Sequence, residues 1–385
     1  MDRRIFFSAA GMAAAAGLVS KPAAGQTPVS KSGSRAGRRR ALMKLGADIE
    51  KVDDPTMKAM ARWGIRNCYA RATIGDRERL YPTVDELHQM REIAERSGIS
   101  IDILRPPNLT MSNVDDEKHP AIMLGESPQR DRDIEAFQTM IKNCSEAGIS
   151  GIRYTLSIVG NTRSESVPGR GDASYVGSRM SDYLSGKVTA VPGRNLNSSI
   201  NKPITKAGRI SADMYWERIT YFLDRVVPVA TQYKVKLASH MEDAMVPPGY
   251  EGVDLVTNSV EGAKKFVSIQ ESPYHGLLFC IGTFAEMLEN PTRDIYDVVR
   301  WFGTHKKIFL VDFRNIRGNH QNFVETFPDD GDIDLLKVMQ VLRDTGYDGM
   351  VVPDHQPVTP GGPEQVNAFQ YGYIRGLIQA VDALP

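Results

Sequence analysis

The chain has 385 residues, of which 41% are hydrophobic, and its 47 basic and 47 acidic side chains give a formal net charge of zero. This composition is typical of one large globular α/β domain. It provides no overall field that would attract nucleic acid, and no nucleic-acid-binding motif is visible, so we expect no nucleic acid among the partners.

Residues 1–25 predict an export signal of the twin-arginine type. Arg3 and Arg4 precede a short apolar stretch from Ser8 to Val19, and small residues after it offer a cleavage site. The stretch is too short to span a bilayer comfortably, so we expect no membrane contact after cleavage and a periplasmic or secreted location. Residues 26–40 are polar and basic, which predicts a disordered leader. An uncleaved N-terminal tail is the alternative.

From residue 41 onward, strand-like and helix-like patterns alternate eight times. The predicted strands span residues 42–45, 65–70, 100–104, 151–156, 236–240, 277–282, 308–313 and 350–353. The predicted helices begin near residues 54, 83 and 130 and then span 212–233, 262–269, 294–302, 332–345 and 366–383. Eight βα units in series favour a (β/α)8 TIM barrel over a doubly wound sheet, with a single catalytic domain over residues 41–385.

Residues 157–211 interrupt this alternation. The segment is rich in Gly, Ser, Arg and Asn, and it follows the fourth strand, which places it on the catalytic face of a TIM barrel. Insertions of this length are usually functional lids or disordered, and we expect a lid-like insertion. Its arginines could meet an anionic substrate: Arg163, Arg170, Arg179 and Arg194. A solvated surface loop is the alternative.

Four consecutive predicted strands end in residues that can bind a metal: His240, Cys280, Asp312 and Asp354. In a closed parallel barrel these ends converge on one face. Each residue has a more ordinary explanation when taken alone, but the joint pattern predicts one divalent ion. Imidazole, thiolate and carboxylate suit a borderline ion such as Mn, Zn, Fe or Co, whereas Mg avoids thiolate.

Neighbouring residues could supply the remaining chemistry. His355 is a candidate general acid or base, with an outward or packing histidine as the alternative. Arg314 could clamp a substrate carboxylate or pair with an aspartate of the metal group. Tyr371 lies early in the last helix and points either into the mouth or into the core. We also expect Asp243, Asn315 and Arg153 to contact the substrate.

Several short motifs together resemble the mannonate dehydratase family over roughly residues 41–384. They read Ser-His-Met-Glu-Asp at 239–243, Phe-Cys-Ile-Gly at 279–282, Phe-Arg-Asn at 313–315, Gly-Asp-Ile-Asp at 331–334 and Pro-Asp-His at 353–355. The resemblance implies a xylose-isomerase-like TIM barrel with one Mn-type ion that converts a sugar acid into a 2-keto-3-deoxy acid.

The resemblance also implies roles for individual residues. His240, Cys280 and Asp354 take the metal-ligand positions, and His355 takes that of the acid–base residue. Tyr371 matches a catalytic tyrosine by a looser alignment. The chain departs from the family in having Asp312 where a histidine is usual, and in its export signal.

Three functions follow in order of preference. The first is a metal-dependent lyase that dehydrates a mannonate-like aldonate. The second is a metal-dependent sugar isomerase or epimerase of the same superfamily, and the third is a non-catalytic exported sugar-binding protein. Each has a sugar or sugar acid as its partner, and the sequence leaves a homo-oligomer open.

Overall fold

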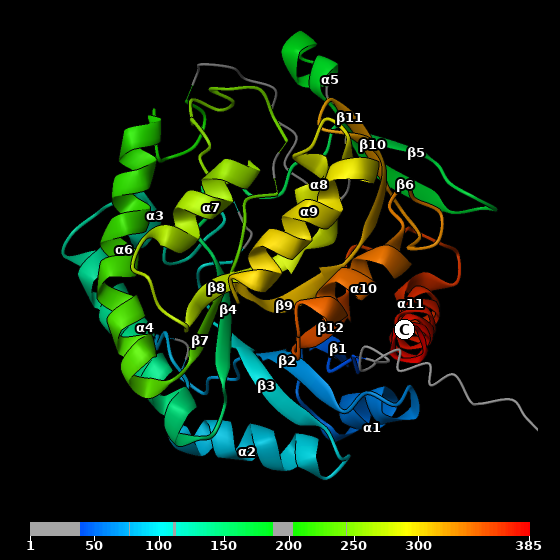
Figure 1. The fold of residues 1–385 in the computed structure, drawn as a ribbon. Coiled ribbons are helices and arrows are strands. Elements are labelled where there is room, and N and C mark those ends of the chain that lie inside the picture. Colours follow the sequence, from blue (N-terminus) through cyan, green and yellow to red (C-terminus); the bar gives the residue numbers. More distant parts are fainter. Residues whose placement is uncertain (1–38, 77, 111–112, 188–202, 244) are drawn as a thin grey trace, which may run out of the picture. The chain divides into compact units, whose positions relative to one another are not determined.

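Eight parallel strands close into a barrel, and helices surround it (Figure 1). The strands are β1 (Lys44–Ile49), β2 (Asn67–Arg71), β3 (Ser100–Arg105), β4 (Gly151–Thr155), β7 (Lys236–His240), β8 (His275–Cys280), β9 (Ile308–Phe313) and β12 (Met350–Pro353). Each strand pairs with the one before it in this series, and β12 pairs with β1 to close the ring. This topology confirms the predicted (β/α)8 TIM barrel.

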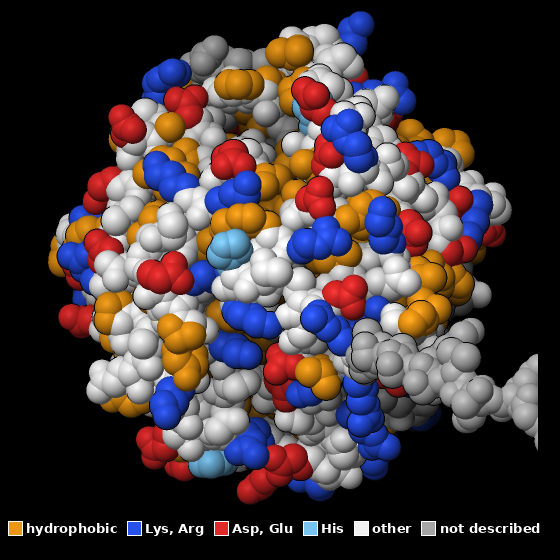
Figure 2. Space-filling view, viewed as in Figure 1, with side chains coloured by type: hydrophobic (Ala, Val, Ile, Leu, Met, Phe, Trp, Pro, Cys, Tyr) orange, Lys and Arg blue, Asp and Glu red, His pale blue; other side chains and the backbone are white. Residues whose placement is uncertain are grey.

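The computed structural model describes residues 39–76, 78–110, 113–187, 203–243 and 245–385. The predicted signal and nearly all of the predicted leader lie outside these residues. No helix in the described part of the chain is long and apolar enough to cross a bilayer. Figure 2 shows acidic and basic side chains interspersed over one face of the molecule, as the zero net charge leads one to expect.

Several of the described helices begin at a side chain that accepts a hydrogen bond from a free backbone N–H group. They are α1 (Asp54–Arg62), α2 (Val84–Glu95), α3 (Ala121–Leu124), α4 (Gln129–Glu146), α5 (Met180–Ser185), α6 (Ala212–Tyr233), α7 (Val260–Ser268), α8 (Ile281–Glu286), α9 (Pro291–Thr304), α10 (Leu335–Asp344) and α11 (Gly362–Ala383). Thr83 and Glu86 form a capping box at α2, and Asp334 caps α10. Gly148 and Gly346, which follow α4 and α10, have φ of 74° and 73°, a conformation that favours glycine.

The sixth barrel strand ends earlier than predicted. It stops at Cys280, and the chain turns at once into the short helix α8. The Cys280 Sγ accepts a hydrogen bond from the Thr283 backbone N–H at 3.4 Å and so caps this helix. The apolar run continues past Cys280 because both faces of α8 are buried, which hides the change from strand to helix in the sequence.

Strand alternation sets which side chains reach the barrel mouth. An apolar layer fills the barrel interior and includes Tyr69, Ile103, Ala238, Leu278, Leu310 and Val352. Successive side chains of a strand point to opposite faces, so the residue two positions further along points inward again. Those residues are Arg71, Arg105, His240, Cys280, Asp312 and Asp354. A polar layer therefore sits on the apolar one at the carboxyl ends of the strands.

A second, antiparallel sheet lies beside the barrel and has the order β10-β11-β6-β5. The hairpin β10 (Asn315–Asn319) and β11 (Asn322–Thr326) directly follows β9, whereas β5 (Glu165–Pro168) and β6 (Ser174–Arg179) belong to the 157–211 insertion. Phe323 of β11 pairs with Ser178 of β6. The described part of the insertion is thus largely ordered by pairing with the hairpin.

Three of the four insertion arginines named above lie in the described part of the chain, and they do not present free charges to a substrate. Arg163 is fully buried, while Arg170 pairs with Asp329 at 2.6 Å and Arg179 pairs with Glu165 at 2.7 Å. Arg194 lies outside the described residues. The structure differs from this expectation because the guanidinium groups of Arg163, Arg170 and Arg179 already have carboxylate partners.

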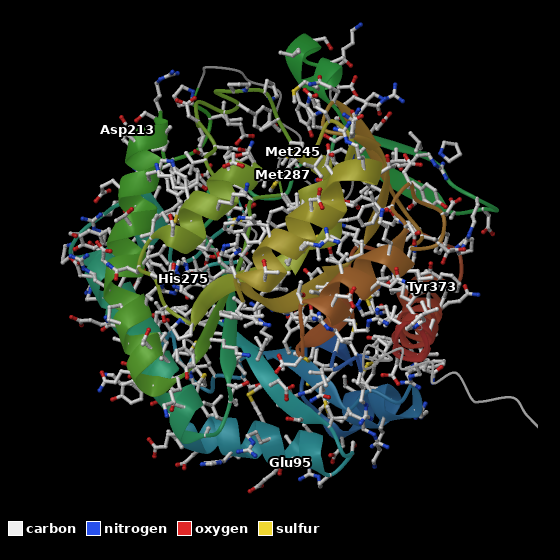
Figure 3. The ribbon with its side chains drawn as sticks, in the orientation of Figure 1. Glu95, Asp213, Met245, His275, Met287 and Tyr373 are labelled. Carbon is white, nitrogen blue, oxygen red and sulfur yellow. The ribbon has the colours of Figure 1, made fainter. Side chains whose placement is uncertain are left out.

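The buried side chain of His275 leads us to expect that the free energy of unfolding decreases at acidic pH. It lies at the start of β8, away from the mouth (Figure 3), and its ring packs against Phe266 with the centroids 5.1 Å apart. Burial lowers the pKa of His275 from 6.5 to about 4. Because the pKa of His275 is higher in the unfolded chain than in the folded one, a falling pH protonates the unfolded chain first. The free energy of unfolding therefore decreases as the pH falls from about 6.5 toward about 4.

We expect His275→Phe to keep the packing and remove this titration. The free energy of unfolding, measured with urea, should decrease between about pH 7.5 and about pH 5 by about 2 kcal/mol more in the wild type than in the variant. His88→Gln, at an exposed position of α2, should behave like the wild type. Equal losses in all three proteins would contradict the assignment.

Candidate active site

The structure brings the four predicted metal ligands to the barrel mouth in two close pairs. The His240 Nε2 lies 3.9 Å from Asp312 Oδ2, and the Cys280 Sγ lies 3.5 Å from Asp354 Oδ2. Cys280 and Asp312 are register partners on neighbouring strands. His240, Cys280 and Asp312 are buried, whereas the Asp354 side chain keeps 20% of its surface exposed. The predicted convergence of these strand ends is therefore present.

The hydrogen bonds around His240 and Asp312 suit a cation. The Nδ1–H of His240 donates to the backbone carbonyl of Met241, so the lone pair of the neutral ring is on Nε2 and faces Asp312. The Asp312 Oδ1 is buried and has no hydrogen-bond partner in the described structure. Two acceptors that face each other in a buried space fit a positive ion, and this donor set fits a borderline divalent metal.

The pKa values of these groups agree with that fit. Burial, with help from the charge of Arg153, lowers the pKa of His240 to about 4 and keeps it neutral. Burial and the neighbouring Asp354 raise the pKa of Asp312 well above its usual range, and burial does the same for the Cys280 thiol. A divalent ion would offset both effects, because it stabilises carboxylate and thiolate.

Beside these strand ends lies a buried cluster of two arginines and three carboxyl groups, here called the arginine–carboxylate cluster: Arg163, Arg314, Asp243, Glu286 and Glu325. Arg163 contacts Asp243 at 3.0 Å, and it also pairs with Glu325. Arg314 contacts Glu325 at 3.0 Å and Asp243 at 3.4 Å, and it pairs with Glu286. Every member is at most 5% exposed.

The charges of this cluster balance if one carboxyl group is neutral. Burial opposes ionisation of Asp243 and Glu325, but the two guanidinium groups outweigh it and hold both pKa values well below their usual range. Burial instead raises the pKa of Glu286 well above its usual range. Two cations then face two anions and one protonated carboxyl group, which satisfies the requirement that buried charges be paired.

Glu325 of this cluster holds His355. The His355 Nδ1 lies 2.7 Å from Glu325 Oε1, so it donates its hydrogen there and the ring lone pair is on Nε2. That nitrogen is 3.8 Å from Asp354 Oδ1 and 3.4 Å from the side-chain nitrogen of Asn161. With 18% of its side chain exposed, His355 is oriented by the protein yet reachable from the mouth.

Four other predicted site residues have different surroundings from those expected. Arg314 has no exposed side-chain surface, and it supports Asp354 at 3.2 Å and Cys280 at 3.4 Å instead of facing the mouth. Asp243 is likewise buried and paired within the cluster. Asn315 donates to the carbonyls of Pro328 and Ile333, so its amide holds a loop. Tyr371 lies in the core, where its hydroxyl meets Met60 of α1 at 3.7 Å. Arg314 and Tyr371 thus adopt the alternatives left open by the sequence, an ion pair with an aspartate of the metal group and a place in the core, and none of the four side chains faces the mouth without a partner.

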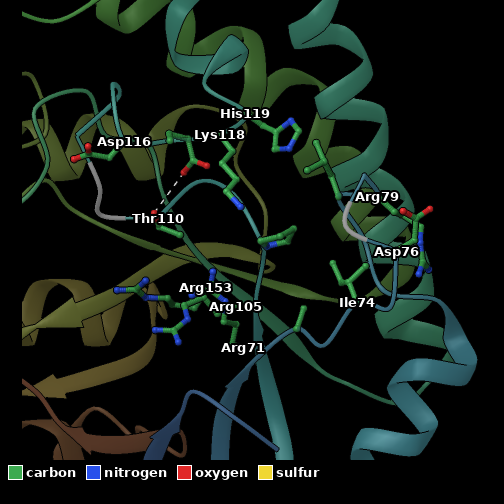
Figure 4. A pocket seen from close by; sticks show the side chains of 14 residues that line it. Arg71, Ile74, Asp76, Arg79, Arg105, Thr110, Asp116, Lys118, His119 and Arg153 are labelled. Carbon is green, nitrogen blue, oxygen red and sulfur yellow. Dashed lines mark hydrogen bonds between the residues drawn. The ribbon is translucent and has the colours of Figure 1, made fainter.

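Arg153 alone among the predicted substrate contacts lies open to a cavity, on the β4 side of the mouth (Figure 4). The sequence reasoning missed the parts played by Glu325, Glu286 and Asn161. Glu325 lies on a short polar strand with no recognisable pattern, and Glu286 belongs to the undetected helix α8. Only the close packing of the insertion against the β10–β11 hairpin brings these groups to His355.

Among the described residues, one group of three side chains has ligand atoms close enough together for a metal site, and it is not the strand-end group. Ligand atoms of Asp243, Glu325 and His355 lie within 4.8 Å of one another. Both carboxylates, however, already accept guanidinium hydrogens from Arg163 and Arg314, which supply the positive charge that an ion would supply. The strand-end group remains the better candidate because two of its acceptors, Asp312 Oδ1 and His240 Nε2, have no guanidinium partner, although Arg314 contacts Asp354 and Cys280.

The fold is that of a TIM-barrel enzyme, and the candidate site lies at the carboxyl ends of its strands, where such enzymes have their active sites. Residues 64–384 match the family model described as D-mannonate dehydratase. The chain therefore belongs to the mannonate dehydratase family and is a hydro-lyase. This family is generally dependent on a divalent metal.

Known relatives agree with this assignment. The mannonate dehydratase of Thermotoga petrophila is 26% identical over 327 residues, covering 78% of this chain and 87% of the relative. That of Streptococcus agalactiae is 27% identical over 318 residues, covering 77% and 86%. The crystal structure of the Streptococcus suis enzyme superposes with a TM-score of 0.72 at 22% identity and covers 89% of this chain and 94% of that one. The relatives thus support a dehydratase over the predicted alternative of an isomerase or epimerase.

Glu325 should act as a positioning residue for His355. We expect Glu325→Gln to lower kcat by about a hundredfold, because the ring loses the anion that fixes its tautomer, with KM changed little. The nitrogen chemical shifts of His355 should show a mixture of tautomers in the variant. Glu165→Gln, which removes the surface pair with Arg179, is the matched control and should change neither quantity. Unchanged His355 nitrogen shifts would rule out this role for Glu325.

Proposed function

We propose that this chain dehydrates an aldonic acid of the mannonate type to the corresponding 2-keto-3-deoxy acid. The observation that carries the proposal is the geometry of His355. Its Nδ1 is fixed on a buried carboxylate, and its Nε2 faces the mouth beside Asp354, next to the candidate metal ligands. A proton-transfer group is therefore held against the place where a metal-bound sugar acid would react.

We further propose one divalent ion, Mn first and Zn, Fe or Co as alternatives, with His240, Cys280, Asp312 and Asp354 as its ligands. When bound, such an ion polarises the substrate carboxylate and an adjacent hydroxyl and so acidifies the C2 proton. Support comes from the unpartnered oxygen of Asp312 and the free Nε2 of His240. Arg314 adds to this support, because its guanidinium group contacts both Asp354 and Cys280 and so fixes their positions.

His355 can move the proton in both halves of the elimination. Its Nε2 takes the C2 proton, and the electron pair of the broken C–H bond forms the C2–C3 double bond. The C3 hydroxyl group leaves as water with the proton that Nε2 returns, and the enol product tautomerises to the 2-keto-3-deoxy acid. Glu325 stabilises the charged ring between the two steps, because its carboxylate lies 2.7 Å from Nδ1.

Asp312 changes the charge of the site relative to the histidine that the family resemblance leads one to expect. A carboxylate in this position adds a negative charge next to Asp354 and the Cys280 thiolate. A bound ion would then be a weaker Lewis acid, and the site would repel an anionic substrate more strongly. Positive charge elsewhere in the mouth would have to offset this repulsion.

The experiment is a turnover assay with parallel metal analysis. Protein loaded with Mn²⁺ should release 2-keto-3-deoxy acid from mannonate or a related hexonate. His355→Asn should lower the rate by at least about a hundredfold while the metal content stays at the wild-type value. Cys280→Ala should lose metal and activity together. Wild-type protein that binds metal but forms no keto acid from any hexonate would refute the proposed reaction.

We also infer export by the twin-arginine route, on the sequence of residues 1–25 alone. Changing Arg3 and Arg4 to lysine should keep the full-length protein inside the cell, since the transport machinery reads the arginine pair. Cell fractionation and immunoblotting measure this. Lys21→Arg, beyond the apolar stretch, is the control and should leave export intact. Equal distribution of all three proteins would contradict the signal.

A further inference from the structure

A row of arginines occupies the half of the mouth opposite the candidate metal ligands. Arg71 and Arg105 are the last residues of β2 and β3 and are register partners. Leu104 pairs with Ile152, so Arg153 of β4 continues the row beside Arg105. The metal-ligand candidates come from β7, β8, β9 and β12, so the mouth has an acidic half and a basic half.

The members of this row differ in their partners. Arg71 pairs with Glu50 at 3.0 Å, and Arg105 pairs with Asp48 at 3.3 Å. Arg153 has neither an ion pair nor a hydrogen bond with any residue that the structure describes, and its Nε is buried without a partner. The charge of Arg153 opposes the rise in the pKa of Asp48 and of Asp312, so both carboxylates lie near it, but no described carboxylate is within ion-pair distance. A direct contact on this partly buried guanidinium is therefore open to an anionic ligand.

A cavity of about 770 Å³ opens in front of Arg153. Arg71 and Arg105 line its floor, and Lys118 and His119, from the segment after β3, line its opposite wall. Figure 4 shows the Lys118 ammonium group extending into the space above Arg153 and Arg105. Lys118 also lacks an ion pair among the described residues, so two unneutralised cations face the same space.

The acidic residues of the lining do not neutralise this pair. Asp116 is directed away from Arg153, and Asp76 lies beside Arg79 at the other side of the cavity (Figure 4). Glu117 accepts a hydrogen bond from Thr110 at 3.4 Å. Arg79 is itself held by Glu86 at 2.7 Å. The charge available to a ligand is therefore that of Arg153 and Lys118.

We propose that the cavity between Arg153 and Lys118 is an anion subsite, and that the substrate is a sugar acid with a second anionic group, a carboxylate or a phosphate, at the end remote from the reacting carbons. The inference rests on the proposed function, which places the first carboxylate on the β7–β12 side. None of the candidate metal ligands, and not His355, lines the cavity. An anion held there is thus a different group from the carboxylate next to C2.

The arrangement suits such a ligand in chemistry and in size. A guanidinium fork and a mobile ammonium group are the usual pair for carboxylate or phosphate. The volume lies within the range of sites that enclose a small molecule, so the remaining carbons of a sugar acid can lie between the two anionic ends. The second charge also compensates for the extra negative charge that Asp312 brings to the metal side.

Isothermal titration calorimetry of the Mn²⁺-loaded protein tests the subsite. The probes are D-gluconate with one carboxylate, D-glucarate with two, and 6-phospho-D-gluconate with a carboxylate and a phosphate. We expect at least one doubly charged acid to bind about tenfold more tightly than gluconate, as one charge-assisted contact provides. The tighter of the two doubly charged acids identifies the second group as carboxylate or phosphate.

Variants separate this site from the general attraction of anions. Lys118→Gln and Arg153→Gln should each bring the affinity for the doubly charged acid down to that for gluconate, with thermal unfolding unchanged for the surface Lys118 variant. Lys142→Gln, an exposed lysine on α4, should keep the full advantage. Equal affinity of wild-type protein for all three acids, or an advantage that survives both substitutions, overturns the proposal.

The proposed reaction and the anion subsite can be refuted separately. If hexonates are dehydrated but the second charge adds nothing to binding, the anion subsite is wrong and the proposed reaction stands. If the doubly charged acids bind through Lys118 and Arg153 but no acid loses water, the subsite stands and the proposed reaction falls.

Discussion

Everything in this site depends on the inward alternation of side chains in a closed parallel barrel. Because every second residue of a strand faces the interior, the apolar layer formed by residues such as Leu278 and Leu310 fixes which later residue reaches the mouth. Cys280 and Asp312 cannot be displaced by one position without turning the whole strand inside out. The chemistry of the mouth is thus as rigid as the core below it.

Acidic and basic side chains occupy separate parts of the mouth, and buried charged groups stabilise the acidic part. Thiol and carboxyl groups gather on β8, β9 and β12, and guanidinium groups gather on β2, β3 and β4. Arg314 links the two groups, because it contacts both Asp354 at a strand end and Glu325 of the arginine–carboxylate cluster. The acidic side chains of these strand ends are therefore supported by buried positive charge that salt screens little.

The barrel and the convergence of the four strand-end side chains were predictable because both follow from local patterns. Apolar runs that end in a polar residue carry their own signal, and α6 was placed at its observed bounds. The support of His355 was not predictable. Glu325 reaches it only because β11 pairs with β6, more than a hundred residues away, and short polar strands show no periodicity. Tyr371 illustrates the remaining ambiguity, since a helix position alone does not say whether a tyrosine faces the mouth or the core.

The pairing of β6 with β11 has a further consequence for how this enzyme can evolve. Arg163 lies near the start of the insertion, yet its guanidinium group pairs with the carboxylate that orients His355, the proposed proton-transfer group. Sequence drift in this peripheral sheet would thus be felt as a change in the chemical step, even at positions that no ligand touches. Substitutions in the peripheral antiparallel sheet and substitutions around His355 are therefore expected to evolve together.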